Sequence, residues 1–306
     1  MCLLQMKMST NKRNDEIISE HVCDHHIHND KLIDPQNINT IISKHRRIVY
    51  NRVPKTGSGP ARIHMETLLL QKGYNVIHYG KHDASHASEE ILQEVCDKTK
   101  AVPEPWLYIG HIHFVNFTKY GCDEQPLYIN LVRDPTDCFI STYYFLRFKH
   151  PRKMSEERRN MTFDDCVMSN HPECSNYENI TRIIPYFCGQ ESYCLERGPR
   201  ALDKAKENIL RYYSVIGYLE NVDEYYNALE IMLPHFFEGL VDEYQTRGKA
   251  FKEKSSGSRK VPPSDVALEE FRNRIWHEYE LYRFIKQRFD CMMTKIKEFR
   301  QVPGKT

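Results

Sequence analysis

The sequence has 306 residues with 43 basic and 42 acidic side chains, so its formal net charge is +1. This length suffices for one large α/β domain with a sizeable core, and the balanced charge argues against a general nucleic-acid-binding protein, which is usually strongly basic. No run approaches the roughly 18 apolar residues of a membrane-spanning helix, and the first residues lack the apolar core of a signal peptide. We therefore expect neither a transmembrane anchor nor a signal peptide within these residues.

Residues 1–45 are polar and uneven in composition, which predicts an N-terminal tail or linker that is partly disordered. One cluster in this segment has residue types that suit zinc: His21, Cys23, Asp24, His25, His26 and His28. Its spacing matches no closed Cys/His pattern, and no second ligand pair follows at a fixed interval. A solvated histidine-rich tail is the preferred interpretation, and we expect no metal site.

A strand, loop, helix and strand follow in that order. Residues 47–53 are β-branched and aromatic, which predicts a buried strand, and the segment 54–60 breaks it. Residues 61–72 have helical spacing, and residues 75–79 predict the next strand. This succession is typical of a parallel sheet.

The rest of the chain continues the alternation. We expect helices over 88–100, 135–148 and 222–233, strands over 106–111, 126–132 and 214–218, a mobile loop over 246–263 and a long helical region over 264–300. The sequence therefore predicts an α/β fold with a central parallel sheet flanked by helices. We expect one domain over residues 46–300 and a C-terminal tail over 301–306.

The loop after the first strand has the features of an anion-binding site. Unpaired N–H groups and the helix dipole favour a phosphate where such a loop opens a helix. Lys55 adds a charge, Thr56 and Ser58 add hydroxyl donors, and Gly57 and Gly59 let the backbone approach a ligand closely. The lysine precedes the glycines, so the Walker pattern fails, and no dinucleotide-binding glycine pattern follows the strand. The loop suits a nucleotide of another kind, and the alternative is a polar turn without a ligand.

A second cationic element follows the strand over 126–132. Arg133 stands at its end and Ser141 eight residues later, in the next predicted helix. Ligands bind at strand ends in open α/β sheets, and an arginine there can clamp a phosphate through two hydrogen bonds. The alternative is that Arg133 pairs with Asp134 or another surface acid.

Cysteines and glycosylation sequons favour a lumenal or extracellular protein. Four of the ten cysteines form two close pairs flanked by loop residues, which predicts local disulfides: Cys166, Cys174, Cys188 and Cys194. Acceptor sequons begin at Asn116, Asn160 and Asn179. The alternative is a cytosolic protein with scattered thiols.

Several separated segments, in order, resemble the uronosyl 2-O-sulfotransferase family, which includes heparan sulfate and dermatan/chondroitin enzymes of the Golgi and the insect Pipe proteins. They are 49–58, 110–114, 128–135, 143–148 and 184–190, and the resemblance extends from about Arg47 to Phe289. It implies a P-loop-like sulfotransferase fold that uses 3′-phosphoadenosine 5′-phosphosulfate (PAPS), a glycosaminoglycan or glycoprotein glycan as acceptor, a membrane-associated place in the Golgi lumen, and a homotrimer. It implies no metal and no nucleic-acid partner.

The resemblance also implies roles for individual residues. Lys55 would stabilise the bridging oxygen and the leaving phosphate, and Thr56, Gly57 and Ser58 would hold the 5′-phosphate. Arg133 and Ser141 would hold the 3′-phosphate. His111 would be the general base on the sugar 2-hydroxyl. Cys166–Cys174 and Cys188–Cys194 would be disulfides, and the Lys/Arg loop with Lys252, Lys254, Arg259 and Lys260 would fold over the cofactor.

The chemistry agrees with these roles. A sugar hydroxyl needs a base near neutral pH, and histidine is the usual one. Sulfuryl transfer resembles phosphoryl transfer, in which cations offset the charge on the leaving group. His113 would share a strand face with His111, so a swapped or shared role stays open, as does a structural role for either histidine.

One departure from the family concerns Gly59 and Pro60, where relatives often have Ser or Thr. Two hydroxyl donors are lost, and Pro60 also lacks its N–H. An active glycan sulfotransferase is the first hypothesis, and a catalytically weak or inactive glycan-binding relative is the second. A nucleotide kinase is disfavoured because no Lys-Ser/Thr pair follows the glycines.

Overall fold

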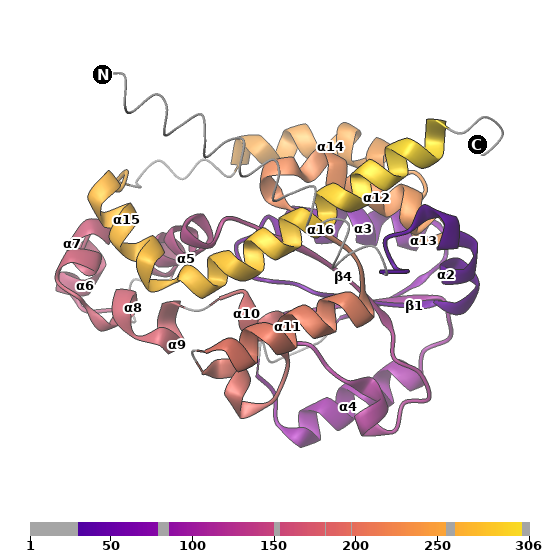
Figure 1. The fold of residues 1–306 in the computed structure, drawn as a ribbon, viewed down its shortest axis with the longest axis horizontal. Helices are drawn as coiled ribbons and strands as arrows, with labels where there is room; N and C mark the ends of the chain where they lie inside the picture. The colour runs from indigo at the N-terminus through magenta and orange to yellow at the C-terminus, as the bar shows by residue number, and fades with distance from the viewer. Residues whose placement is uncertain are drawn as a thin grey trace.

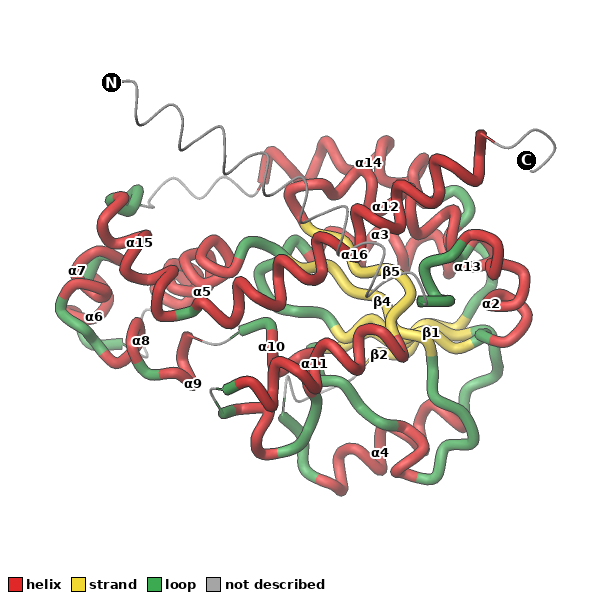
Figure 2. The backbone as a smooth tube through the Cα atoms, in the orientation of Figure 1, coloured by secondary structure: helices red, strands yellow, loops and turns green. Residues whose placement is uncertain are grey.

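The computed structural model describes residues 30–78, 86–149, 154–180, 182–196, 198–254 and 261–301. Its centre is a sheet of parallel strands in the order β2-β3-β1-β4-β5, drawn in yellow in Figure 2. The strands are β1 (Arg47–Asn51), β2 (Asn75–His78), β3 (Trp106–Gly110), β4 (Leu127–Val132) and β5 (Tyr213–Tyr218). Every residue of β3, β4 and β5 is buried, which explains their continuous apolar and aromatic sequences. The predicted α/β fold is confirmed.

Helices cover both faces of the sheet (Figure 1). One face carries α3 (Ser58–Gln71), α12 (Val222–Met232), α13 (Pro234–Phe237) and α14 (Leu240–Lys254), and the other carries α4 (Glu89–Lys100), α10 (Ile184–Cys188) and α11 (Pro199–Tyr212). The connection from β1 to β2 leads toward the β2 edge of the sheet, whereas the connections from β2 to β3, from β3 to β4 and from β4 to β5 all lead toward the β5 edge. Because parallel crossovers are right-handed, the two sets of helices lie on opposite faces. The long α16 (Trp276–Gln301) packs along β5 and α11.

The segment before β1 packs against this core in its described part. It forms η1 (Pro35–Asn37) and α2 (Ile38–Lys44) and buries Ile33 and Ile41. Asp30 Oδ2 accepts a hydrogen bond from Nε of Arg288 on α16 at 2.8 Å, and both side chains are buried. Residues before 30, which include the histidine-rich cluster, lie outside the described residues. The predicted domain bounds, 46 and 300, stay a prediction.

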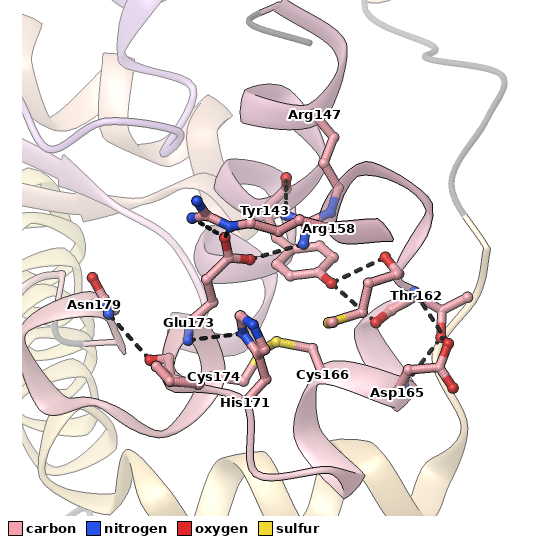
Figure 3. A network of polar contacts seen from close by, with 12 residues as sticks. Tyr143, Arg147, Arg158, Thr162, Asp165, Cys166, His171, Glu173, Cys174 and Asn179 are labelled. Carbon is pink, nitrogen blue, oxygen red and sulfur yellow. Dashed lines mark hydrogen bonds and ion pairs between the residues drawn. A yellow bond between two sulfur atoms is a disulfide. The ribbon is translucent and has the colours of Figure 1, made fainter. Parts of the chain in front are cut away.

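A second, smaller core lies beside the C-terminal ends of β1 and β4. It is built by α5 (Pro135–Lys149), α7 (Phe163–Met168), α8 (Pro172–Ser175), α9 (Tyr177–Ile180) and α15 (Asp265–Arg274). The short helix α6 (Glu156–Asn160) lies beside it and buries no side chain. The Cys166–Cys174 disulfide and Glu173, which pairs with both Arg147 and Arg158, hold it together (Figure 3). Arg147 is almost fully buried and lies on the ring of Tyr143, so this ion pair fixes the end of α5.

Two predictions about elements were wrong in part. The loop expected from residue 246 begins later, because α14 continues to Lys254. The helical region after residue 264 is two helices, and the chain leaves helical geometry at Ile275. Several elements were not predicted at all, among them α11 and the short helices α6 to α10. The short elements η2 (Phe117–Tyr120), η4 (Ser192–Leu195) and η5 (Leu219–Asn221) were not predicted either. None of the helices over the described ranges has the length and apolar character to cross a membrane.

Candidate active site

The loop between β1 and α3 adopts the conformation of an anion cradle. Lys55 has φ 66° and Gly57 has φ 77°, and α3 begins at Ser58 with no side-chain cap at its N-terminus. The left-handed backbone angle favours glycine at this position, and a Cβ atom at Gly57 would lie 2.5 Å from Cδ1 of Leu219, so that side chain would have to shift. Left-handed geometry at Lys55 is unusual for a non-glycine residue and is typical of functional loops.

The two hydroxyl groups of the loop are turned inward. Thr56 Oγ1 and Ser58 Oγ both donate to the carbonyl oxygen of Val53, at 2.9 and 2.8 Å, and both residues are buried. In this structure both hydroxyl protons therefore stabilise the loop, and the prediction that these hydroxyls donate to a ligand stays a prediction. The groups left for an anion are the backbone N–H groups at the start of α3.

Helix α5 packs against this loop. The Lys55 ammonium lies 4.0 Å from the ring centroid of Phe145, and the Cys138 thiol lies 3.2 Å from the carbonyl oxygen of Pro54. Burial raises the pKa of the Cys138 thiol to about 12, while Arg133 and Lys55 both act on it electrostatically. Cys138 is therefore a neutral packing residue, and the two candidate phosphate-binding cations lie in its neighbourhood.

Arg133 stands at the C-terminal end of β4, as predicted. Its Nη2 donates to Oδ2 of Asp137, one turn into α5, at 3.1 Å, so the acid partner is Asp137 and not Asp134. Asp134 instead accepts from the hydroxyl of Tyr279 at 3.0 Å. Ser141 lies one further turn along α5 and is partly exposed. Arg133 and Ser141 thus lie along one side of this helix.

His111 follows β3 and is bound by a single residue at both ring nitrogens. Its Nδ1 donates to the carbonyl oxygen of Arg52 at 2.8 Å, and its Nε2 lies 3.0 Å from Nη2 of Arg52. A guanidinium group has no acceptor, so Nε2 accepts and Nδ1 carries the proton. This is the tautomer that a general base acting through Nε2 requires.

His113 has different surroundings. It is 4% exposed and packs edge-on against Tyr186 at a centroid distance of 4.9 Å. Burial, helped by the neighbouring His86, lowers the pKa of His113 to about 3. Because β3 ends at Gly110, the two histidines lie in the following loop and not on a strand face. His111 meets Arg52, whereas His113 is turned into the core.

Comparisons with known proteins agree with this architecture. Residues 39–285 match the profile described as the Sulfotransferase family. The chain belongs to this family. It is 33% identical over 269 residues to uronyl 2-sulfotransferase of Mus musculus, covering 84% of this chain and 66% of that protein. It is 34% identical over 253 residues to heparan sulfate 2-O-sulfotransferase 1 of Xenopus laevis, covering 79% of this chain and 70% of that protein. The resemblance to 2-O-sulfotransferases seen in the sequence is confirmed.

The chain spans just under two thirds of the length of the uronyl relatives: 66% of the Mus musculus protein and 64% of the Homo sapiens protein. Within the family match lie the loop at Lys55, the histidine at 111 and the arginine at 133.

A buried polar network that includes the end of β1 was not predicted. Asn51, at the end of β1, donates to the carbonyl oxygen of Tyr186 at 2.9 Å. Its Oδ1 accepts from Asn130 at 2.9 Å and from the hydroxyl of Tyr213 at 3.1 Å. The network joins β1, β4, β5 and α10. The N–H of Phe114, in the loop that carries His111, donates to the same Tyr186 carbonyl oxygen at 2.9 Å, so the segment 184–190 lies against that loop. Arg52 was also not predicted as a site residue, although it directly follows β1, and the carboxyl end of a parallel strand is where ligands bind.

Other predicted residues lie away from this site. Cys166–Cys174 and Cys188–Cys194 are disulfides, and the structure adds Cys96–Cys122. The three sequon asparagines are exposed: Asn116, Asn160 and Asn179. The side chains of Lys252, Lys254, Arg259 and Lys260 lie outside the described part of the structure.

Proposed function

We propose that this protein transfers a sulfuryl group from PAPS to the 2-hydroxyl of a uronic acid residue in a glycosaminoglycan or related glycan. The observation that carries the proposal is the double hydrogen bond of His111 with Arg52, beside the loop that holds Lys55. It supplies a base in the required tautomer next to a phosphate cradle. The names of the relatives, uronyl and heparan sulfate 2-O-sulfotransferases, support the substrate class.

The residues present fit the phosphates of PAPS. The N–H groups at the start of α3, with Gly57 in the left-handed region, would bind the 5′-phosphate end, and Lys55 would contact the bridging oxygen. Arg133 and Ser141, at the end of β4 and on α5, would bind the 3′-phosphate.

In the proposed reaction, His111 Nε2 takes the proton of the acceptor hydroxyl, which replaces the Arg52 contact at that atom. The sugar oxygen forms a bond to sulfur while the bond from sulfur to the phosphate oxygen breaks. Lys55 offsets the charge that grows on this leaving oxygen. The products are a sulfate ester, adenosine 3′,5′-bisphosphate (PAP) and a proton that leaves from His111.

Further features support a lumenal setting, which we propose to be the Golgi. Three disulfides lie among the described residues, and such bonds persist in oxidising compartments. The sequon asparagines Asn116, Asn160 and Asn179 are exposed, as glycosylation requires. A homotrimer is proposed on the family resemblance alone.

The alternative proposal is a weak or inactive relative that binds an acidic glycan. Gly59 and Pro60 support it, since both lie in the first turn of α3 and neither offers a hydroxyl. Thermal unfolding tests donor binding for both proposals: a ligand specific to the folded state raises the melting temperature. We expect PAPS and PAP, but not ATP, to raise it. Equal stabilisation by ATP, or none by PAPS, would contradict the transferase proposal.

A further inference from the structure

The contact between Lys55 and Phe145 joins the phosphate loop to a helix far along the chain. The ammonium nitrogen lies over the ring face, 4.0 Å from its centroid. The Phe145 side chain is 38% exposed. The backbone of Lys55 has φ 66°, so the loop presents this side chain in a specific direction.

The position of the ring is fixed by the rest of α5. Cys138, two turns earlier, is fully buried and contacts the carbonyl oxygen of Pro54, the residue before Lys55. Residues 138, 141 and 145 are spaced by three and four, so they share one helix face. This face carries both Ser141, the candidate 3′-phosphate ligand, and the ring that holds Lys55.

An aromatic partner suits a lysine that must act on an anion. The ring attracts the cation through its quadrupole without neutralising the charge, whereas a carboxylate would compete with an anionic donor. Lysine has a flexible four-carbon chain, so a ring that restricts it reduces the disorder of the ammonium group.

We propose that Phe145 is a positioning residue, which holds the Lys55 ammonium where the leaving oxygen gains charge during sulfuryl transfer. This inference rests on the proposed function. Because that charge grows only in the transition state, loss of the ring lowers kcat and leaves donor binding nearly unchanged.

The test uses the full chain, PAPS, and desulfated heparan, dermatan and chondroitin as acceptors. Phe145→Leu lowers kcat about twofold to thirtyfold, the range expected for loss of a cation–π contact, and changes the dissociation constant of PAPS, measured without acceptor, less than about twofold. Phe145→Tyr keeps the ring and restores kcat. The matched control is Phe148→Leu, on the same helix, where a 47% exposed ring stacks on Tyr144; its kcat stays at the wild-type value.

A double-mutant cycle decides whether the effect passes through Lys55. In a Lys55→Ala background, Phe145→Leu has no further effect on kcat. An equal fall in both backgrounds, a Phe145→Leu kcat equal to that of the control, or weakened PAPS binding with a lowered melting temperature would each overturn the inference. If the unmodified chain binds PAP but transfers no sulfate, the transferase proposal itself fails, and this inference fails with it.

Discussion

His111 and Arg52 are joined by two hydrogen bonds, one from Nδ1 to the Arg52 carbonyl oxygen at 2.8 Å and one between Nε2 and Nη2 at 3.0 Å. The backbone bond orients the imidazole and survives substitution of the arginine side chain. The side-chain bond places a guanidinium beside the atom that would accept the proton. The same residue therefore sets the tautomer of the proposed base and puts a positive charge at the acceptor side of the site.

Arg52→Ala keeps the carbonyl and removes the guanidinium. We expect the KM for an acidic glycan to rise about tenfold, because a charge-assisted hydrogen bond to the acceptor is lost. The dissociation constant of PAP should stay nearly constant in calorimetry. Arg211→Ala, which removes an exposed arginine from α11, is the control for a general loss of positive charge. An unchanged acceptor KM in Arg52→Ala would show that the guanidinium does not meet the acceptor.

Gly57 and Gly59 form a matched pair in the phosphate loop. Gly57 has a φ of +77°, and a Cβ atom there would lie 2.5 Å from Leu219. A Cβ atom at Gly59 would meet nothing within 4 Å. Gly57→Ala should weaken PAP binding at least about tenfold, since left-handed backbone alone is costly for alanine. Gly59→Ala should leave it within about twofold, and Gly59→Ser, which adds a hydroxyl at the start of α3, should strengthen it. Equal effects of both alanine variants would contradict this loop geometry.

In the proposed site, Asp137 would compete with the 3′-phosphate for Arg133. Nη2 of Arg133 lies 3.1 Å from Oδ2 of Asp137, and the Asp137 side chain is 55% exposed. Because an exposed ion pair is weak, a ligand can readily replace Asp137. We expect Asp137→Asn to tighten PAP binding about twofold to fivefold at low salt and less at high salt. Calorimetry at two salt concentrations measures this. Weaker binding of PAP by Asp137→Asn would show that the acid orients Arg133 instead of competing for it.

His113 makes the stability of the fold sensitive to acid. Its folded pKa of about 3 lies below the unfolded value, so the unfolded chain binds a proton first as the pH falls. The contribution of His113 to stability is complete above about pH 6.5 and is lost between there and about pH 3. Between pH 7 and 5, wild type should lose about 1–2 kcal/mol more unfolding free energy than His113→Asn. Urea unfolding at both pH values checks this, and parallel losses would contradict it.

The sheet could be predicted because its strands are buried runs of β-branched and aromatic residues. The carboxyl end of one such strand also indicated Arg133, since ligands gather there, whereas His111 was indicated by the family resemblance. The contacts of Arg52 with His111 and of Phe145 with Lys55 could not be read in this way, because they join positions 59 and 90 residues apart along the chain.

The Cys96–Cys122 disulfide was missed for a similar reason. Its cysteines are separated by 26 positions, so spacing gives no signal, unlike the separations of 8 and 6 in the other two pairs. The inward turn of the Thr56 and Ser58 hydroxyls was also hidden. A hydroxyl in a phosphate loop can donate to a ligand or to the loop itself, and only the position of the Val53 carbonyl decides.

The central claim is sulfuryl transfer with His111 as the base, and the most direct measurement is labelled-sulfate transfer from PAPS by the full chain, beside His111→Ala. The acceptors are desulfated heparan, dermatan and chondroitin, in parallel. We predict label on one polymer, a fall in kcat of at least about 100-fold in His111→Ala, and equal stabilisation of both proteins by PAP. Activity of His111→Ala within about tenfold of wild type would contradict the role of His111, and PAP binding without transfer by wild type would contradict the enzyme.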